Sequence, residues 1–152
     1  MLTAYLRSIG RGFSTLVFPE ACLVCAAPGS ELCNICKHRF IPKPKFLSGE
    51  KFSIYASLPY DEVSKKVILL SKEQGLVAAH RILARAVSSA ISAFRLKGPA
   101  SIILIPTQSK SLRRRGFNHL EEIGKLILQN GFINQEIEFI NALEFTRRIS
   151  DQ

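Results

Sequence analysis

Ser101-Ile-Ile-Leu-Ile105, followed by Pro106, carries the main signal of the fold class. It is short, apolar and rich in β-branched residues. Such a run is typical of a strand that is covered on both faces in a parallel sheet. Proline cannot donate to a strand ladder, so Pro106 ends the strand. The sequence therefore predicts a buried parallel strand here.

The residues after this strand predict a helix and then a second strand. Asn118 suits the N-cap of the helix, with Glu121 at its third position, and the helix should run to about Asn130 with Gly131 as its C-cap. Residues 137–140 have the pattern of the next strand. Strand, loop, helix and strand in this order make half of a doubly wound α/β domain.

Two helices are predicted before the strand, over residues 63–72 and from residue 76 to about residue 94, with Gly75 as the break between them. Before them, residues 52–60 are β-prone, and Pro59 suits the end of a strand. His80 falls on the apolar stripe of the second helix, where we expect a packed, hydrogen-bonded side chain rather than a ligand. The residues expected to face inward in the first helix are Val63, Val67 and Leu70.

All four cysteines fall within one short segment, as Cys22-Leu-Val-Cys25 and Cys33-Asn-Ile-Cys36. Two residues between thiolates let both sulfurs reach one ion at the zinc–sulfur distance of ~2.3 Å, and two such pairs complete a tetrahedron. The alternatives are two disulfides, which require an oxidising compartment, and a chance cluster of inert thiols. Four thiolates leave no position for His38 or for a catalytic water. We therefore predict a structural zinc site.

The chain is predicted to have three parts. Residues 1–18 form an amphipathic helix, which lacks the unbroken apolar run of a secretory signal or a membrane span. Residues 19–46 hold the zinc knuckle and a basic linker, which is predicted to be extended over residues 37–45 because of its two prolines. Residues 47–152 hold a partial α/β domain. Reduced cysteines indicate the cytoplasm.

The charge of the chain favours polyanionic partners, because 21 Lys and Arg against 12 Asp and Glu give a net charge of +9. Residues 106–119 are predicted as a loop at the carboxyl end of the strand, where open α/β sheets bind ligands. This loop offers positive donors for phosphate oxygens, a glycine that allows close backbone approach, and no acid near them in the sequence. A solvated basic turn is the alternative. The candidate phosphate-binding residues are Lys110, Arg113, Arg114, Arg115 and Gly116.

The order of these parts carries a family resemblance. After the cysteine pairs come a Tyr-containing strand, then Lys72-Glu-Gln-Gly75, Ile105-Pro106 and Arg113-Arg-Arg-Gly-Phe-Asn118, and residues 143–152 end in a Gln. This order resembles the ComF family, bacterial proteins named from natural competence that pair a zinc knuckle with a type I phosphoribosyltransferase-like domain. The resemblance covers nearly all of this chain but only the front portion of the family's usual length. We therefore expect a carboxyl-terminally truncated member.

The resemblance implies an incomplete phosphoribosyltransferase-like parallel sheet with helices, preceded by the four-cysteine knuckle. In a complete relative, two acidic residues after a strand contact ribose, a Thr-Thr-Gly turn holds the 5-phosphate of phosphoribosyl pyrophosphate, and Mg²⁺ binds the pyrophosphate. This sequence has only two aspartates, Asp61 and Asp151, and no Thr-Thr. Its acid pairs, Asp61-Glu62 and Glu121-Glu122, stand at predicted helix starts, where the helix dipole favours them. We expect no catalytic residue and no activity of this chain alone.

The resemblance also implies a role in natural competence, in the uptake and processing of transforming DNA, with Arg113, Arg114 and Arg115 steadying pyrophosphate. The alternative is a non-catalytic module in which the knuckle and the basic loop bind single-stranded DNA or a protein of the competence machinery. Basic residues next to aromatic ones, such as Arg39-Phe40 and Lys45-Phe46, are compatible with it.

Overall fold

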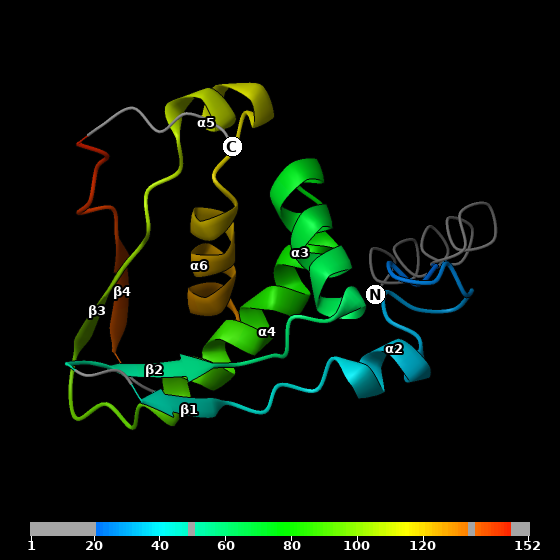
Figure 1. Cartoon of the computed structure of the whole chain (residues 1–152), viewed down its shortest axis with the longest axis horizontal. Helices are drawn as coiled ribbons and strands as arrows, with labels where there is room; N and C mark the ends of the chain where they lie inside the picture. The colour runs from blue at the N-terminus through cyan, green and yellow to red at the C-terminus, as the bar shows by residue number, and fades with distance from the viewer. Residues whose placement is uncertain (1–20, 49–50, 134–135, 147–152) are drawn as a thin grey trace, which may run out of the picture. The chain divides into compact units, whose positions relative to one another are not determined.

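The computed structural model describes residues 21–48, 51–133 and 136–146, and it divides the chain into two compact units (Figure 1). Unit 1 ends at Phe40 and unit 2 begins at Ile41. The helix predicted over residues 1–18 and the end of the 143–152 segment lie outside the described residues. Within the described part, no helix is long and apolar enough to cross a membrane.

Among the described residues of unit 1, from Ala21 to Phe40, there is one short helix, α2 (Asn34–Arg39). This helix takes in residues 37–39, which the sequence predicted as the start of an extended linker, and that part of the prediction is wrong. Residues 34–41 contain no proline, so the helix that starts after Cys33 can continue to Arg39. The extended chain begins only near Pro42, because a proline disfavours helix at the residue before it.

Unit 2 begins with an antiparallel hairpin of β1 (Lys45–Ser48) and β2 (Ser53–Ala56). β2 lies within the β-prone segment 52–60, as predicted, whereas β1 starts inside the predicted linker. The ring of Tyr55 on β2 lies 4.6 Å from Phe94 and 5.4 Å from Phe46 between ring centroids. These aromatic contacts connect the hairpin to the residue that follows α4 (Val77–Ala93).

α3 (Glu62–Gln74) begins and ends at clear signals in the sequence. Asp61 is its N-cap: a side-chain oxygen of Asp61 accepts from the Ser64 N–H at 2.9 Å, and Ser64 Oγ accepts from the Asp61 N–H at 2.9 Å. Gly75 ends the helix in the left-handed conformation, with φ of 64°. The three residues predicted to face inward are buried, namely Val63, Val67 and Leu70.

α4 is the central helix of unit 2, because it packs against α3, against β2 and against α6 (His119–Gln129). His80 on α4 is buried, and its Nε2 lies 3.1 Å from the backbone oxygen of Ser71. The prediction of a packed, hydrogen-bonded histidine is therefore confirmed. Ile123 and Ile127 of α6 are also buried.

β3 (Ala100–Ile103) and β4 (Ile137–Ile140) pair in parallel, joined through α5 (Ser109–Arg115) and α6. α6 covers one face of the pair so closely that a Cβ added at Gly124 would lie 3.0 Å from the Phe139 ring. On β3 and just after it, Ile103 is 50% exposed and Ile105 is 71% exposed. No described element covers this second face, so the prediction of a strand covered on both faces is wrong.

The fold is mixed α/β, as predicted. Its described strands form two separate two-stranded sheets, the hairpin β1–β2 and the parallel pair β3–β4. Figure 1 shows the helices α3, α4 and α6 beside these small sheets. The described residues contain the strand–helix–strand unit but no larger parallel sheet.

Candidate functional site: a cysteine cluster and a basic cavity

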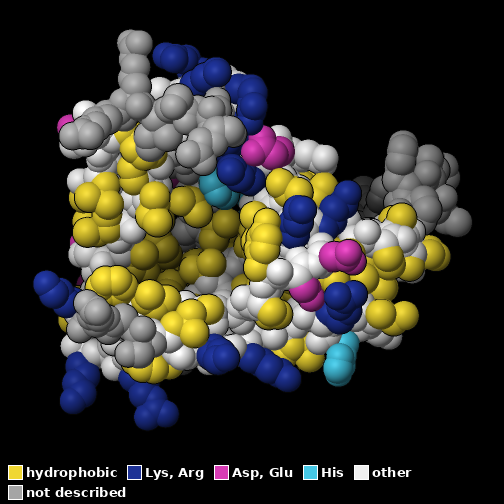
Figure 2. Space-filling view, viewed as in Figure 1, with side chains coloured by type: hydrophobic (Ala, Val, Ile, Leu, Met, Phe, Trp, Pro, Cys, Tyr) yellow, Lys and Arg dark blue, Asp and Glu magenta, His cyan; other side chains and the backbone are white. Residues whose placement is uncertain are grey.

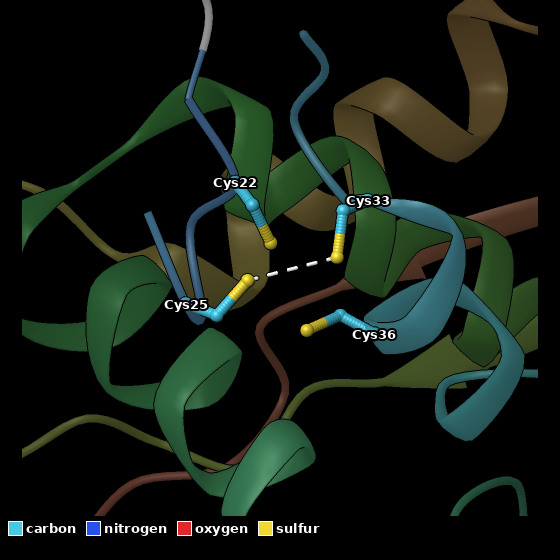
Figure 3. A group of neighbouring side chains, drawn as sticks. All are labelled: Cys22, Cys25, Cys33 and Cys36. Carbon is cyan, nitrogen blue, oxygen red and sulfur yellow. Dashed lines mark hydrogen bonds between the residues drawn. The ribbon is translucent and has the colours of Figure 1, made fainter. Parts of the chain in front are cut away.

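The four cysteines form a compact cluster in unit 1, and Figure 3 shows their sulfur atoms turned toward a common centre. Their Sγ atoms all lie within 4.8 Å of one another, and those of Cys25 and Cys33 are 3.6 Å apart. A tetrahedral ion with zinc–sulfur distances of ~2.3 Å would separate its ligands by roughly 3.8 Å. The cluster therefore has the dimensions of a tetrahedral metal site, built from four free thiols.

Local backbone geometry brings these thiols together. In the first pair, the Ala26 N–H donates to the backbone oxygen of Cys22 at 2.8 Å, and Ala26 adopts a positive φ of 60°. Gly29, with φ of 113°, turns the chain between the pairs. In the second pair, Cys33 is the N-cap of α2 and Cys36 lies in its first turn. Each pair is therefore organised by a single turn.

The electrostatics of the cluster favour a bound cation. Burial raises the pKa of the Cys22 thiol, but backbone N–H groups of Cys25, Cys33 and Val24 outweigh it and bring that pKa down to about 6. Burial, followed by the neighbouring cysteine side chains, raises the pKa of Cys36 to about 12. Four thiolates this close repel one another, so a cation that stabilises them must displace protons when it binds.

The donor set determines what this cluster can do. Thiolates are soft ligands, and four of them in a tetrahedron suit zinc or an iron–sulfur centre. Four protein ligands leave no open coordination position, so a metal here would stabilise unit 1 and would not activate water. His38 is exposed and lies outside the cluster.

The predicted basic loop is in part a helix, which corrects the sequence analysis. α5 spans residues 109–115, starts after Gln108 and ends at Gly116, whose φ of 78° makes it a left-handed C-cap. The role of Gly116 is therefore to end α5, and its N–H donates to the Leu112 oxygen at 2.8 Å. The sequence between Pro106 and Gly116 contains good helix formers such as Leu112 and the arginines, and nothing in it forbids a helix of two turns.

The three consecutive arginines at the end of α5 have different surroundings. The side chain of Arg114 is 68% exposed, whereas that of Arg115 is only 5% exposed. Arg113 and Lys110 are exposed residues of the same helix. Figure 2 shows Lys and Arg side chains gathered over α5, with acidic side chains beside them.

An acid from a distant part of the sequence faces this cluster, contrary to the prediction of an unneutralised loop. Glu73, near the end of α3, places its Oε2 2.9 Å from Arg114 Nη2 and 3.4 Å from Arg115 Nε. The Glu73 side chain is 38% exposed, so solvent weakens these pairs. One carboxylate shared by two arginines leaves a net positive charge at the end of α5.

A cavity of about 420 Å³ opens beside α5, and Arg115 is part of its wall. Its volume falls within the range of small-molecule sites, roughly 300–1,000 Å³. Its lining combines cationic side chains, hydroxyls and apolar groups. The lining residues are Lys72, Ile105, Pro106, Thr107, Gln108, Ser111, Arg115, His119, Leu120 and Phe145.

Two sequence segments, Lys72–Gly75 and Arg113–Asn118, contact each other beside the cavity, and each contributes one residue to its wall, Lys72 and Arg115. A Cβ added at Gly75 would lie 2.8 Å from Cε1 of Phe117, so the absence of a side chain at Gly75 allows this ring to lie against the backbone. The same ring contacts His80 edge-on, with centroids 6.0 Å apart. Together with the Glu73 pairs, these contacts hold α3, α4 and α5 in a defined arrangement around the cavity.

His119 is the histidine of the cavity wall, and it is the first residue of α6. Burial lowers its pKa, and the positive charges of Arg115 and Lys72 lower it further. The preceding residue, Asn118, is the N-cap, as predicted: its Oδ1 accepts from the Leu120 N–H at 3.2 Å and its Nδ2 donates to Glu121 at 2.9 Å. Because its pKa is lowered, His119 is a neutral imidazole at neutral pH.

Sequence analysis did not assign the roles of Lys72, Glu73 and His119. Lys72 and Glu73 belong to a segment that carried the family resemblance, but no spacing rule connects them to residues on α5. His119 follows a good N-cap residue, which places it at the start of a helix and gives no sign of a cavity. Of the predicted phosphate-binding residues, only Arg115 lines the cavity, whereas Lys110, Arg113, Arg114 and Gly116 lie outside its lining.

The comparisons with known proteins return no match: no family model, no curated protein and no solved structure is similar to this chain.

Proposed function

We propose that this chain is a ComF-like module, in which a structural zinc ion supports unit 1 and the basic cavity of unit 2 binds the phosphate groups of a phosphosugar. The observation that carries the proposal is that the two resemblance segments contact each other, through Gly75 with Phe117 and Glu73 with Arg114. Each segment also contributes one cationic residue to the cavity wall, Lys72 and Arg115. Motifs that come together in space around cationic side chains are consistent with a shared ligand.

The zinc part of the proposal rests on the cysteine cluster. Zinc is the common occupant of a closed tetrahedral set of four thiolates, and Cys22, Cys25, Cys33 and Cys36 supply all four. Free thiols persist in a reducing compartment, so we place the protein in the cytoplasm. The zinc would contribute to folding of unit 1, whose short helix and turns bury little apolar surface.

The phosphate part rests on the chemistry of the cavity wall. Arg115 presents a guanidinium, the side-chain type that binds phosphate oxygens through two parallel hydrogen bonds. Lys72 adds a second positive charge, and Thr107 and Ser111 add hydroxyls. Ile105 and Phe145 give the apolar surface that a sugar or base would contact. In the proposed scheme β3 and α6 correspond to the first strand and helix of a type I phosphoribosyltransferase-like sheet.

We propose that these 152 residues bind a phosphosugar but do not catalyse its reaction. Asp61 is the N-cap of α3, so this aspartate has a structural role and is not half of a ribose-binding acid pair. Phosphoribosyl pyrophosphate and Mg²⁺ would require the acidic pair and the Thr-Thr-Gly turn of a complete relative. The process that we propose for the module is the uptake and processing of transforming DNA in natural competence.

The decisive test uses pyrophosphate as the probe and isothermal titration calorimetry of the zinc-loaded chain as the measurement. Arg115→Ala should weaken binding about 10-fold to 100-fold, which corresponds to the loss of charge-assisted hydrogen bonds of about 1.5–3 kcal/mol. Arg113→Ala is the matched control, since Arg113 is exposed and outside the cavity. Equal losses in the two variants would mean that the cavity is not the site.

A second candidate function is favoured by the exposure of Arg113 and Arg114. Two exposed arginines on a short helix can follow a nucleic-acid backbone without sequence preference, which is the behaviour of a single-stranded DNA-binding module. A protein of the competence machinery with an acidic surface is the other partner of this kind. Binding of single-stranded DNA that is unaffected by Arg115→Ala and by excess pyrophosphate would favour this candidate over the cavity.

A further inference from the structure

Unpartnered polar atoms gather at the basic cavity. Among the described residues, four buried side-chain nitrogen or oxygen atoms have no hydrogen-bond partner: Ser71 Oγ, Arg115 Nε, Arg115 Nη1 and His119 Nδ1. Three of the four belong to Arg115 and His119, which line the same cavity. Native structures pair nearly all buried polar atoms, so several unpaired nitrogens at one cavity indicate a ligand that supplies acceptors.

We propose that His119 is an anion ligand of the basic cavity, and that its Nδ1 donates to an oxygen of the same tetrahedral oxyanion that Arg115 binds. This inference rests on the proposed function and names a ligand residue and a protonation state that the phosphate-binding proposal does not contain. Its ligand class is a dianionic phosphate or sulfate group.

Arg115 and His119 differ from Asn118 in their hydrogen bonding. Asn118 makes the hydrogen bonds of the helix N-cap, to the Leu120 N–H, to Glu121 and to Thr107 Oγ1. Arg115 is nine-tenths buried, and its Nε lies 3.4 Å from Glu73 Oε2, which is an ion-pair distance without hydrogen-bond geometry. Its Nε and Nη1 and the His119 Nδ1 are therefore donor positions without an acceptor in the described structure.

The charges around His119 determine its protonation state. The groups that face it are Lys72 and Glu73 from α3, His80 from α4 and Arg115 from α5. Burial and the cations among them keep the imidazole neutral when no anion is bound. A dianion in the cavity opposes the positive charge of Arg115 and Lys72, so it stabilises the imidazolium, which has a proton on both ring nitrogens.

Anion binding should therefore be coupled to proton uptake by His119. The pKa of this histidine is lowered in the free protein and is raised by the bound dianion, so the bound state holds more protons between the two values. By linkage, the affinity for a dianion increases as pH falls through that window, up to a limit of about tenfold per pH unit for one proton.

Sulfate is the probe that tests this coupling, because it stays dianionic while imidazole titrates. Calorimetric titrations of the zinc-loaded full chain, from about pH 5.5 to about pH 8 and in buffers of low and high ionisation enthalpy, measure proton uptake directly. We expect a maximum of at least about half a proton per sulfate. His119→Asn should still bind sulfate through Arg115, with no proton uptake. His38→Asn is the matched control, since His38 is exposed and outside this unit.

A second measurement needs no variant. The chain has three histidines, His38, His80 and His119, so their NMR titrations can be followed one by one. Saturating sulfate should raise the pKa of His119 and leave the ring resonances of His38 in place. Sulfate binding without proton uptake, or uptake that persists in His119→Asn, would overturn the role of His119 and leave the phosphate site intact. Failure of the wild-type chain to bind sulfate or pyrophosphate at all would remove the proposed function and this inference together.

Discussion

The cysteine cluster of unit 1 and the basic cavity of unit 2 are sites of two different kinds. The cluster takes all its ligands from residues 22–36, and each pair is closed by one turn. The cavity takes its polar side chains from the ends of α3 and α5, from the start of α6 and from the residues after β3. A site built from one local segment can be predicted from the sequence, whereas a site built by helix packing can be found only once the fold is known.

The contrast continues inside the basic segment. Arg113, Arg114 and Arg115 are equivalent in the sequence, but successive residues of a helix point about 100° apart. Arg114 therefore faces solvent and Arg115 faces the cavity, with side-chain exposures of 68% and 5%. The same charge therefore has two different surroundings in neighbouring positions.

The largest effect is expected at the cysteine cluster. Cys36→Ser removes one of four ligands, and we expect loss of nearly all tightly bound metal from protein purified without added zinc. Elemental analysis measures the metal per chain, and limited proteolysis of residues 21–40 measures the order of unit 1. His38→Ala should keep one zinc per chain. Full metal content in Cys36→Ser would contradict the four-thiolate site.

The next effect tests how the cavity is assembled. Gly75→Ala forces a side chain into left-handed backbone, at about 1–2 kcal/mol, and into the Phe117 ring, at roughly 1–3 kcal/mol more. Gly116→Ala carries only the backbone cost, because nothing lies within 4 Å of the Cβ added there. Thermal or denaturant unfolding should rank Gly75→Ala as the less stable variant.

Adding Phe117→Leu to Gly75→Ala makes the comparison sharper. A smaller side chain at residue 117 should relieve the overlap, so the double variant should lose less stability than the sum of the single changes. Additive losses would show that the two segments do not press against each other at this point.

A smaller effect is expected on the salt dependence of single-stranded DNA binding. Arg113 and Arg114 are exposed, and each phosphate contact contributes about 0.7 to the slope of log affinity against log salt. Replacing both with Ala should reduce the slope by about 1.4, while Arg115→Ala should leave it nearly unchanged. The control changes Lys43 and Lys45, which are exposed and have the same total charge. An equal reduction in the control would mean that DNA contacts a diffuse basic surface.

The smallest effect is expected at Glu73, the acid shared by Arg114 and Arg115. Glu73→Gln removes a partly exposed negative charge, so pyrophosphate affinity should increase by about twofold to fivefold, in line with the ~0.2–1 kcal/mol of an exposed pair. The gain should shrink at high salt, because screening weakens exposed charges. Calorimetry at two salt concentrations measures both changes. A loss of affinity would show that the main effect of Glu73 is to position Arg115 for the anion, and not to compete with the anion for Arg115.

Much of the fold could be predicted because its signals are local. Asp61 and Asn118 start helices, Gly75 ends one, and the spacing of Val63, Val67 and Leu70 identifies the buried face of α3. Two of the predictions that were wrong concern how a strand is covered and which residues are helical. The strand before Pro106 was expected to be covered on both faces, and residues 109–115 were expected to be a loop. An apolar strand pattern does not state how many layers cover it, and a run of basic residues suits a short helix as well as a turn.

Local sequence patterns were enough to predict the cysteine cluster, the boundaries of the main helices and the cationic character of residues 110–115, because each depends on residues close together in the chain. Tertiary packing alone shows which arginine faces the cavity, that Glu73 is its neighbour and that His119 shares its wall. These relations depend on how α3, α4, α5 and α6 pack, through contacts such as Gly75 with Phe117. Helix packing is set by the whole buried surface, so it cannot be predicted from a short stretch of sequence.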